Sequence, residues 1–178
     1  MTIHVGEIRG LTLWRPWAAA FLQRASRVYW TDGTETTIRP KRVENRDWYP
    51  KWAVRPMVGG VAEARPDSPL HIALHAGCTL DREALASLRA DGWAELGPGA
   101  PSLIVGICRL VRVLDYDELG MMHPLVQPHA AWAVGRYLWE VDDVQPLAEA
   151  VDCKGAQGLW KLPAGIEEQV RSQIGRMS

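Results

Sequence analysis

The run from Leu103 to Leu114 constrains the fold most, because it is long, rich in Val and Ile, and typical of a single extended strand. Gly106 lies within this run and predicts a bulge or bend. Further strands are expected at residues 10–13, 70–75, 136–141 and 158–162. Helices do not alternate regularly with these strands, so a parallel βαβ sheet is not expected. The order instead predicts an α+β fold with a largely antiparallel or mixed sheet.

Two helices are predicted from signals at their ends. Pro16 suits the first position of a helix that runs to Leu22, because its missing N–H costs nothing there. Asp81 can cap a second helix, and Gly92 can end it. Ala76-Gly77 is expected to end the strand that precedes this second helix.

A β-hairpin and a closing helix complete the predicted elements. Asp32-Gly33 separates two runs of β-forming residues, which is a strong signal for a hairpin over about residues 28–38. Over about residues 164–176, apolar residues recur with a spacing of four, which predicts an amphipathic helix. The recurring apolar residues are Ile166, Val170 and Ile174.

The composition limits the class of partner. The formal net charge is -1 at pH 7, so the chain lacks the broad basic field of a general polyanion binder, although a local basic site stays open. Nine tryptophans are unusual, and an indole serves equally well in a core or as a stacking platform for a base. Trp139, on an alternating strand, and Trp160 are expected in the core.

Cysteine usage and hydropathy point to a reduced compartment. The three cysteines lie far apart without a C-x-x-C pair, which favours buried thiols over disulfides or a zinc site. No apolar run approaches the ~18 residues of a membrane helix, and no N-terminal signal pattern is present. No P-loop or H-E-x-x-H pattern occurs. These features predict a cytoplasmic location, no membrane partner, no metal and no cofactor.

Five short motifs follow one another in the order seen in ASCH domains. They are TLWRPWA at 12–18, KRVENR at 41–46, IALHAG at 72–77, IVG at 104–106 and CKGAQGLW at 153–160. Over about residues 10–163 the chain therefore resembles the ASCH family of the PUA-like superfamily. The resemblance implies a small mixed β-barrel of five or six strands with flanking helices and a cleft beside the first helices. Residues 1–178 would form a single ASCH/PUA-like domain, with the hairpin as an insertion.

The resemblance also implies a substrate class. PUA-like domains bind RNA or modified bases in such clefts, so we expect an RNA- or nucleotide-binding protein that recognises a plain or modified nucleotide. Some ASCH members resemble ribonucleases, and one subgroup resembles amidohydrolases acting on acetylated cytidine. Those hydrolases place a Thr nucleophile three residues after their Lys, where this chain has Glu44. A hydrolase that uses Lys41 and Glu44 is therefore the alternative, and the sequence leaves enzymatic activity open.

Lys41, Glu44 and Arg46 belong to the densest polar cluster in the chain. Lys and Arg can hold a phosphate, and Glu44 can accept from a base N–H or act as a general base. The alternative is a solvated strand edge. In a regular strand Lys41 and Glu44 would face opposite sides, so they meet only if the chain turns there.

Five further residues are candidates for nucleotide contacts. Trp17 and Trp48 lie beside charged residues and can stack on a base. His75 is placed by the resemblance at a strand end that opens on the cleft, although a hydrogen-bonded structural His is equally compatible with its position. Lys154 and Gln157 lie in a Gly-flanked turn, which can approach a phosphate or a base edge, or serve only as a tight turn.

Overall fold

The computed structural model describes residues 6–29, 31–93, 97 and 99–174, which form a mixed α/β structure rich in strands. The strands are β1 (Glu7–Arg15), β2 (Ser26–Tyr29), β3 (Glu35–Ile38), β4 (Val43–Arg46), β5 (Val61–Glu63), β6 (Leu70–Leu80), β7 (Leu103–Asp115), β8 (Tyr137–Asp152) and β9 (Leu159–Lys161). The helices are α1 (Trp17–Leu22), α2 (Arg82–Ala90), α3 (Tyr116–Leu119) and α4 (Ala164–Ile174), with a short 3-10 turn at Gln127–His129. None of these helices has the length and apolar character that a membrane crossing requires.

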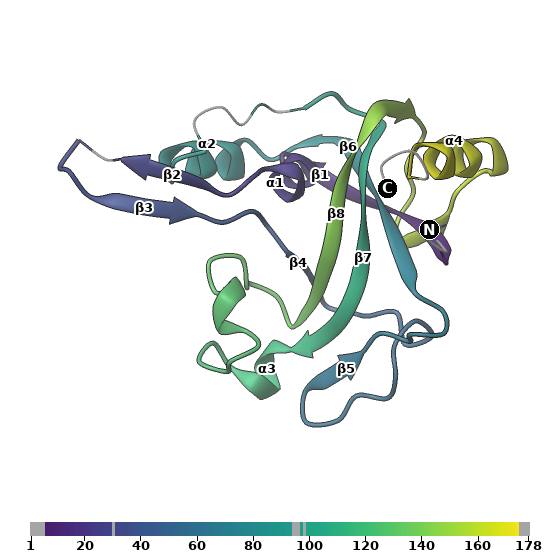
Figure 1. Ribbon diagram of the computed structural model, residues 1–178, viewed down its shortest axis with the longest axis horizontal. Coiled ribbons are helices and arrows are strands. Elements are labelled where there is room, and N and C mark those ends of the chain that lie inside the picture. Colours follow the sequence, from purple (N-terminus) through teal and green to yellow (C-terminus); the bar gives the residue numbers. More distant parts are fainter. Residues whose placement is uncertain (1–5, 30, 94–96, 98, 175–178) are drawn as a thin grey trace.

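Seven of the strands form one sheet in the order β4-β8-β7-β6-β1-β9, with β5 paired to β7. The long, bent strands β7 and β8 run through its middle (Figure 1). The pair of β1 and β6 is parallel, and the other pairs in this sheet are antiparallel. The two end strands, β4 and β9, are four and three residues long and do not pair with each other. The described strands therefore do not form the expected closed barrel, because closure would require β4 and β9, at opposite ends of the strand order, to pair with each other.

Local signals placed most strands, but two strands are much longer than predicted. The strand expected at residues 136–141 is β8, which continues to Asp152 because it pairs along most of its length with β7. Gly106 lies at a register shift between β7 and β8, as its position in the sequence predicts. Ala76-Gly77 does not end β6, which continues to Leu80. Ala76 pairs with Leu103 on β7 and with Leu13 on β1, so neighbours on both sides keep the strand extended.

Helix α2 begins at its predicted capping residue, whereas α1 begins one residue later than predicted. The Asp81 carboxylate accepts a hydrogen bond from the Ala84 N–H at 2.9 Å, and Gly92 follows α2 with φ at 105°. Pro16 is the residue before α1 rather than its first helical residue. Helix α4 ends within the described residues at Ile174 and packs against β8, so the expected end at residue 176 lies outside them.

The predicted hairpin is present as β2 and β3, which pair antiparallel around the Asp32-Gly33 turn. Trp30, which the sequence also assigns to this hairpin, lies outside the described residues. Ile38 is buried at the base of the hairpin and packs with Leu88 of α2. The hairpin and α2 lie at one end of the sheet and α4 at the other (Figure 1). The base of the hairpin is therefore part of a small core that it shares with α2.

Candidate functional site

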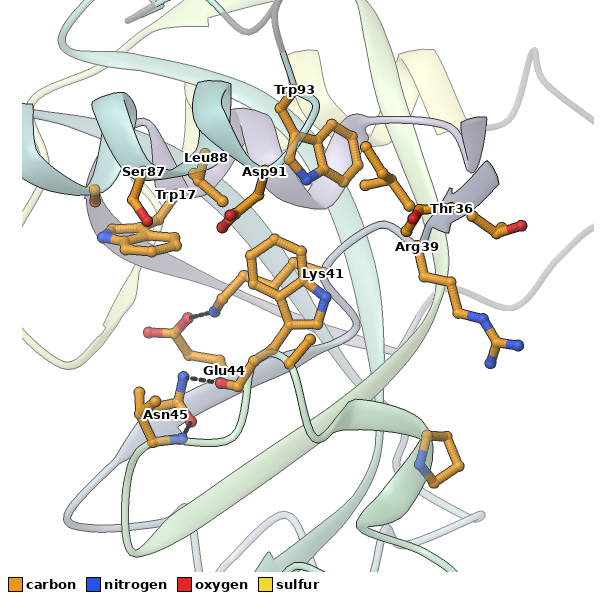
Figure 2. A pocket seen from close by; sticks show the side chains of 17 residues that line it. Trp17, Thr36, Arg39, Lys41, Glu44, Asn45, Ser87, Leu88, Asp91 and Trp93 are labelled. Carbon is orange, nitrogen blue, oxygen red and sulfur yellow. Dashed lines mark hydrogen bonds and ion pairs between the residues drawn. The ribbon is translucent and has the colours of Figure 1, made fainter. Parts of the chain in front are cut away.

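A pocket of about 780 Å³ opens where the hairpin, α2 and β4 meet (Figure 2). Its size falls within the range of about 300–1,000 Å³ that small-molecule sites occupy, which suits a nucleoside. The lining residues are Trp17, Thr36, Thr37, Ile38, Arg39, Lys41, Glu44, Asn45, Ala84, Ser87, Leu88, Asp91, Trp93, Pro128, Ala131, Trp132 and Val134.

Three indoles from separate parts of the chain form much of the wall. Trp17 begins α1, Trp93 follows α2, and Trp132 lies in the loop before β8. The Trp93 and Trp132 rings have centroids 6.3 Å apart and are tilted by 55°. Trp93 is buried, whereas Trp17 and Trp132 are half-buried and offer ring surface to the cavity. Such surfaces can stack on a base, with about 1–3 kcal/mol for each stacked base.

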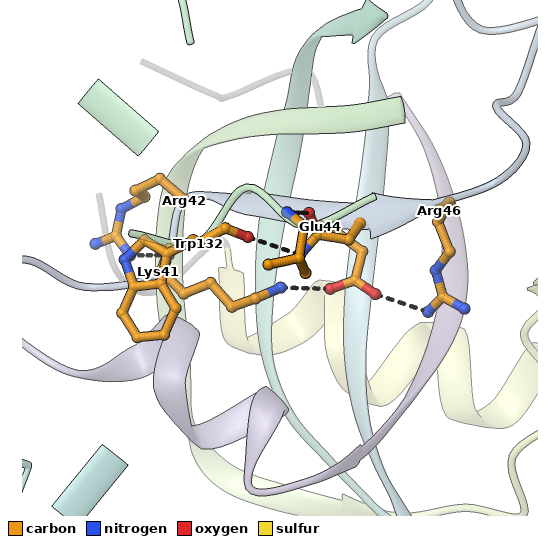
Figure 3. Close-up of polar contacts among 7 residues, drawn as sticks. Lys41, Arg42, Glu44, Arg46 and Trp132 are labelled. Atoms are coloured by element: carbon orange, nitrogen blue, oxygen red, sulfur yellow. Dashed lines mark hydrogen bonds and ion pairs between the residues drawn. The ribbon is translucent and has the colours of Figure 1, made fainter. Parts of the chain in front are cut away.

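The predicted polar cluster forms a buried chain of ion pairs (Figure 3). Lys41 Nζ lies 2.6 Å from Glu44 Oε2, and an Arg46 guanidinium nitrogen lies 2.9 Å from Glu44 Oε1. Lys41 is 3% exposed and Glu44 is 8% exposed. The two side chains meet because β4 begins only at Val43, so Lys41 lies outside the strand and its alternation.

Burial sets the chemistry of Lys41. Its Nζ lies 4.4 Å from the centroid of the Phe21 ring and 5.8 Å from that of the Trp17 ring. Loss of solvation lowers the pKa of Lys41 below its ordinary value, and the Glu44 carboxylate opposes that shift. The ammonium still has two N–H groups beyond the one that it donates to Glu44, so it can donate to a ligand.

Asn45 connects β4 to the loop that carries Trp132. Its Nδ2 donates to the Trp132 carbonyl at 2.9 Å, and its Oδ1 accepts from the Val134 N–H at 3.0 Å. With both ends of the amide bound, Asn45 fixes the backbone of this loop against β4. It therefore positions the Trp132 indole at the pocket.

His75 lies outside the pocket and has structural partners. Its Nε2 is 2.8 Å from the Cys153 carbonyl, and its ring meets the edge of Trp160 with centroids 5.7 Å apart. Gly155 packs directly against the His75 ring and the Thr12 hydroxyl, so a larger residue would not fit there. Burial lowers the pKa of His75, which favours a neutral ring that connects β6 to the turn after β8.

The remaining predicted residues also lie away from the pocket lining. Trp48 is partly exposed, meets the buried Trp139 edge-on with centroids 4.8 Å apart, and accepts the Trp139 indole N–H through its carbonyl at 3.0 Å. Lys154 and Gln157 are exposed on the turn before β9. The pocket therefore brings together Trp17, Lys41 and Glu44, and Arg46 reaches the site through Glu44. Trp139 and Trp160 are buried, as expected.

Sequence reasoning missed the residues that α2 contributes. Ser87 and Asp91 lie four apart on one face of this helix region, a spacing that in sequence alone indicates an ordinary solvated face. Trp93 follows two residues later, and Arg39 lies at the rim after β3. Only the packing of α2 against the hairpin makes these residues neighbours of Lys41.

Comparison with known proteins assigns no family. No protein-family model matches the chain, and no curated protein matches it. The ASCH resemblance stays a prediction, and the function is inferred from the pocket.

Proposed function

We propose that this chain is an ASCH-type, PUA-like protein that binds RNA or a nucleotide by holding one plain or modified base in the pocket. The observation that carries the proposal is the combination of three indoles with the buried Lys41–Glu44 pair in one cavity of about 780 Å³. The five sequence motifs support the PUA-like assignment, and the mixed, largely antiparallel sheet is compatible with it, although the described strands do not form the closed barrel that the motifs imply.

Each part of the pocket has a role in this proposal. An indole stacks on the base, and the free N–H groups of Lys41 donate to an acceptor on its edge. Arg39, exposed at the rim, can fork onto a phosphate. The pocket is large enough for a nucleoside, and RNA would enter it by an unstacked base from a loop or a single-stranded segment.

A hydrolase is the second candidate, because Lys41 combines burial with a lowered pKa beside a carboxylate. A buried lysine of this kind is a common feature of catalytic sites. Glu44 would act as the general base for a water molecule, and Lys41 would stabilise the developing negative charge. Glu44 stands where the acetylcytidine hydrolases that the chain resembles place a Thr nucleophile, so their covalent route does not transfer.

Binding is tested by titrating nucleoside monophosphates and a short single-stranded RNA while following tryptophan fluorescence. Trp132→Ala removes a pocket indole, and we expect it to weaken binding by about 1–3 kcal/mol, or roughly 5- to 150-fold. Trp14→Ala is the matched control, because Trp14 is 58% exposed and does not line the pocket. Equal losses in the two variants, or no binding by the unaltered protein, would contradict the proposal.

The hydrolase alternative is tested by incubating the protein with the same RNA and with N-acetylated cytidine and measuring products. If Glu44 is a general base, Glu44→Gln should lower turnover per folded molecule by about 10²–10⁴, while the folded fraction, measured by its fluorescence, still binds. Binding without product from either substrate would favour the binding protein. Product formation that Glu44→Gln leaves untouched would exclude Glu44 as the base.

A further inference from the structure

Helix α2 contributes two unused polar side chains to the pocket. Ser87 lies on α2, and Asp91 is the residue that caps its C-terminus. Figure 2 shows both side chains pointing from the helix into the cavity, toward the side that holds Lys41 and Glu44. Asp91 forms no hydrogen bond or ion pair through its side chain with any residue that the structure describes.

The position of the Asp91 carboxylate is not explained by helix stability. The backbone N–H of Asp91 completes the helix by donating to the Ser87 and Arg89 carbonyls, and this does not need the side chain. The C-terminal end of a helix carries partial negative charge, so a carboxylate there is unfavourable. Asp91 is exposed and has no partner among the described residues, so its two acceptor oxygens are open at the edge of an aromatic pocket to a ligand that supplies hydrogen-bond donors.

We propose that Asp91 selects the base, and that the pocket prefers guanine; this inference rests on the proposed function. An ionised carboxylate only accepts hydrogen bonds, and its two oxygens can accept from two adjacent donors. Guanine offers such a pair in its N1–H and its N2 amino group. Adenine and cytosine place a ring-nitrogen acceptor beside their amino group, and uracil places its single N–H between two carbonyl oxygens. Among these four bases, guanine is therefore the one that can donate a hydrogen bond to each of the two carboxylate oxygens of Asp91.

The remaining polar groups are consistent with the same base. Guanine carries the O6 acceptor next to N1, and Lys41 is a donor with free N–H groups in the same cavity. Ser87 can donate or accept beside Asp91. In a duplex the N1 and N2 groups are paired, so this selection requires a free nucleotide or an unpaired guanine.

The experiment compares the 5′-monophosphates of guanosine, inosine, xanthosine, adenosine, cytidine and uridine by fluorescence titration. The unaltered protein should bind the guanosine nucleotide most tightly. Inosine lacks the N2 amino group, so its nucleotide should bind about tenfold more weakly, the equivalent of one charge-assisted hydrogen bond. An equal affinity for the guanosine and inosine nucleotides would overturn the proposal.

Asp91→Asn supplies the reciprocal test. The amide keeps one acceptor for N1–H and replaces the other with a donor, which clashes with the N2 amino group but matches the O2 of xanthine. The variant should lose about tenfold in affinity for the guanosine nucleotide and gain a similar factor for the xanthosine nucleotide. Asp67→Asn makes the same charge change at an exposed residue outside the pocket lining and should alter neither affinity.

The outcomes separate this inference from the proposed function. Nucleotide binding with no base preference, or a guanine preference that Asp91→Asn leaves intact, would overturn the role of Asp91 while the nucleotide pocket stands. Binding of none of the nucleotides would overturn both. Thermal unfolding verifies that the variant is folded: its Tm should equal or exceed that of the unaltered protein, because a like charge is removed from the helix terminus.

Discussion

Replacing Glu44 with Gln should destabilise the protein strongly, because the carboxylate compensates two cations at once. Glu44 holds Lys41 at 2.6 Å and Arg46 at 2.9 Å, and the Lys41 side chain is almost fully buried. Removing one partner of a buried ion pair leaves an uncompensated charge and costs about 3–5 kcal/mol. That is a large part of the roughly 5–15 kcal/mol that stabilises a typical domain.

The cost should depend on pH, because Lys41 can relieve it by losing its proton. Burial already lowers the pKa of Lys41 in the folded protein, and loss of the Glu44 charge lowers it further. In the unfolded chain Lys41 regains its ordinary pKa of about 10.4. Between the folded and unfolded values the unfolded chain binds more protons, so stability rises with pH. This rise begins at lower pH in Glu44→Gln, and the difference from the unaltered protein should therefore shrink from neutral toward alkaline pH.

The assay is urea denaturation followed by tryptophan fluorescence, repeated across that pH range. Asp142→Asn is the matched control, because it breaks the exposed Arg109–Asp142 pair, and it should cost only about 0–1 kcal/mol. Combining Lys41→Met with Glu44→Gln should recover most of the lost stability, since the buried cation is removed as well. A cost for Glu44→Gln no larger than that of Asp142→Asn would refute the reasoning.

Three smaller predictions test the fold and the binding surface. Asp81→Ala removes the side-chain cap of α2 and should lower the free energy of unfolding by about 1 kcal/mol in urea denaturation. Gly155→Ala drives a methyl group into His75 and Thr12 and should cost about 2–3 kcal/mol. Gly33→Ala meets nothing within 4 Å and should cost only about 1 kcal/mol for its positive φ, so equal Tm losses would contradict this contrast. Binding to single-stranded RNA should fall with salt at a slope magnitude of about 2–4 in a plot of log K against log salt, and a slope near ten would indicate a different, more basic surface.

Local patterns in the sequence were enough to place most of the elements. The Val- and Ile-rich run gives β7, and Asp32-Gly33 gives the hairpin turn. Strand pairing between distant segments could not be predicted in the same way. The extension of β6 depends on its pairing with β1 and β7. Whether the sheet closes depends on pairing between its two short end strands, and no local sequence pattern indicates whether they pair.

The candidate site was predictable only where its residues are close in sequence. Lys41 and Glu44 were found from their polar segment, although alternation along a strand argued against their meeting. Asp91 and Trp93 enter the pocket because α2 packs against the hairpin, and nothing in their local sequence indicates that contact. The motif around Lys154 folds into a separate turn held by His75, which the linear order of the motifs does not reveal.

The most direct test of the proposed pocket is to observe the indole N–H resonances by NMR while guanosine monophosphate is added. The chain has nine tryptophans, so each resonance can be assigned by single substitutions. We predict shifts for Trp17, Trp93 and Trp132, which line the pocket, and none for Trp52, which is half exposed elsewhere. Shifts confined to Trp48, whose ring lies near Gly158 in the Lys154 turn, would place the ligand at that turn and contradict the account.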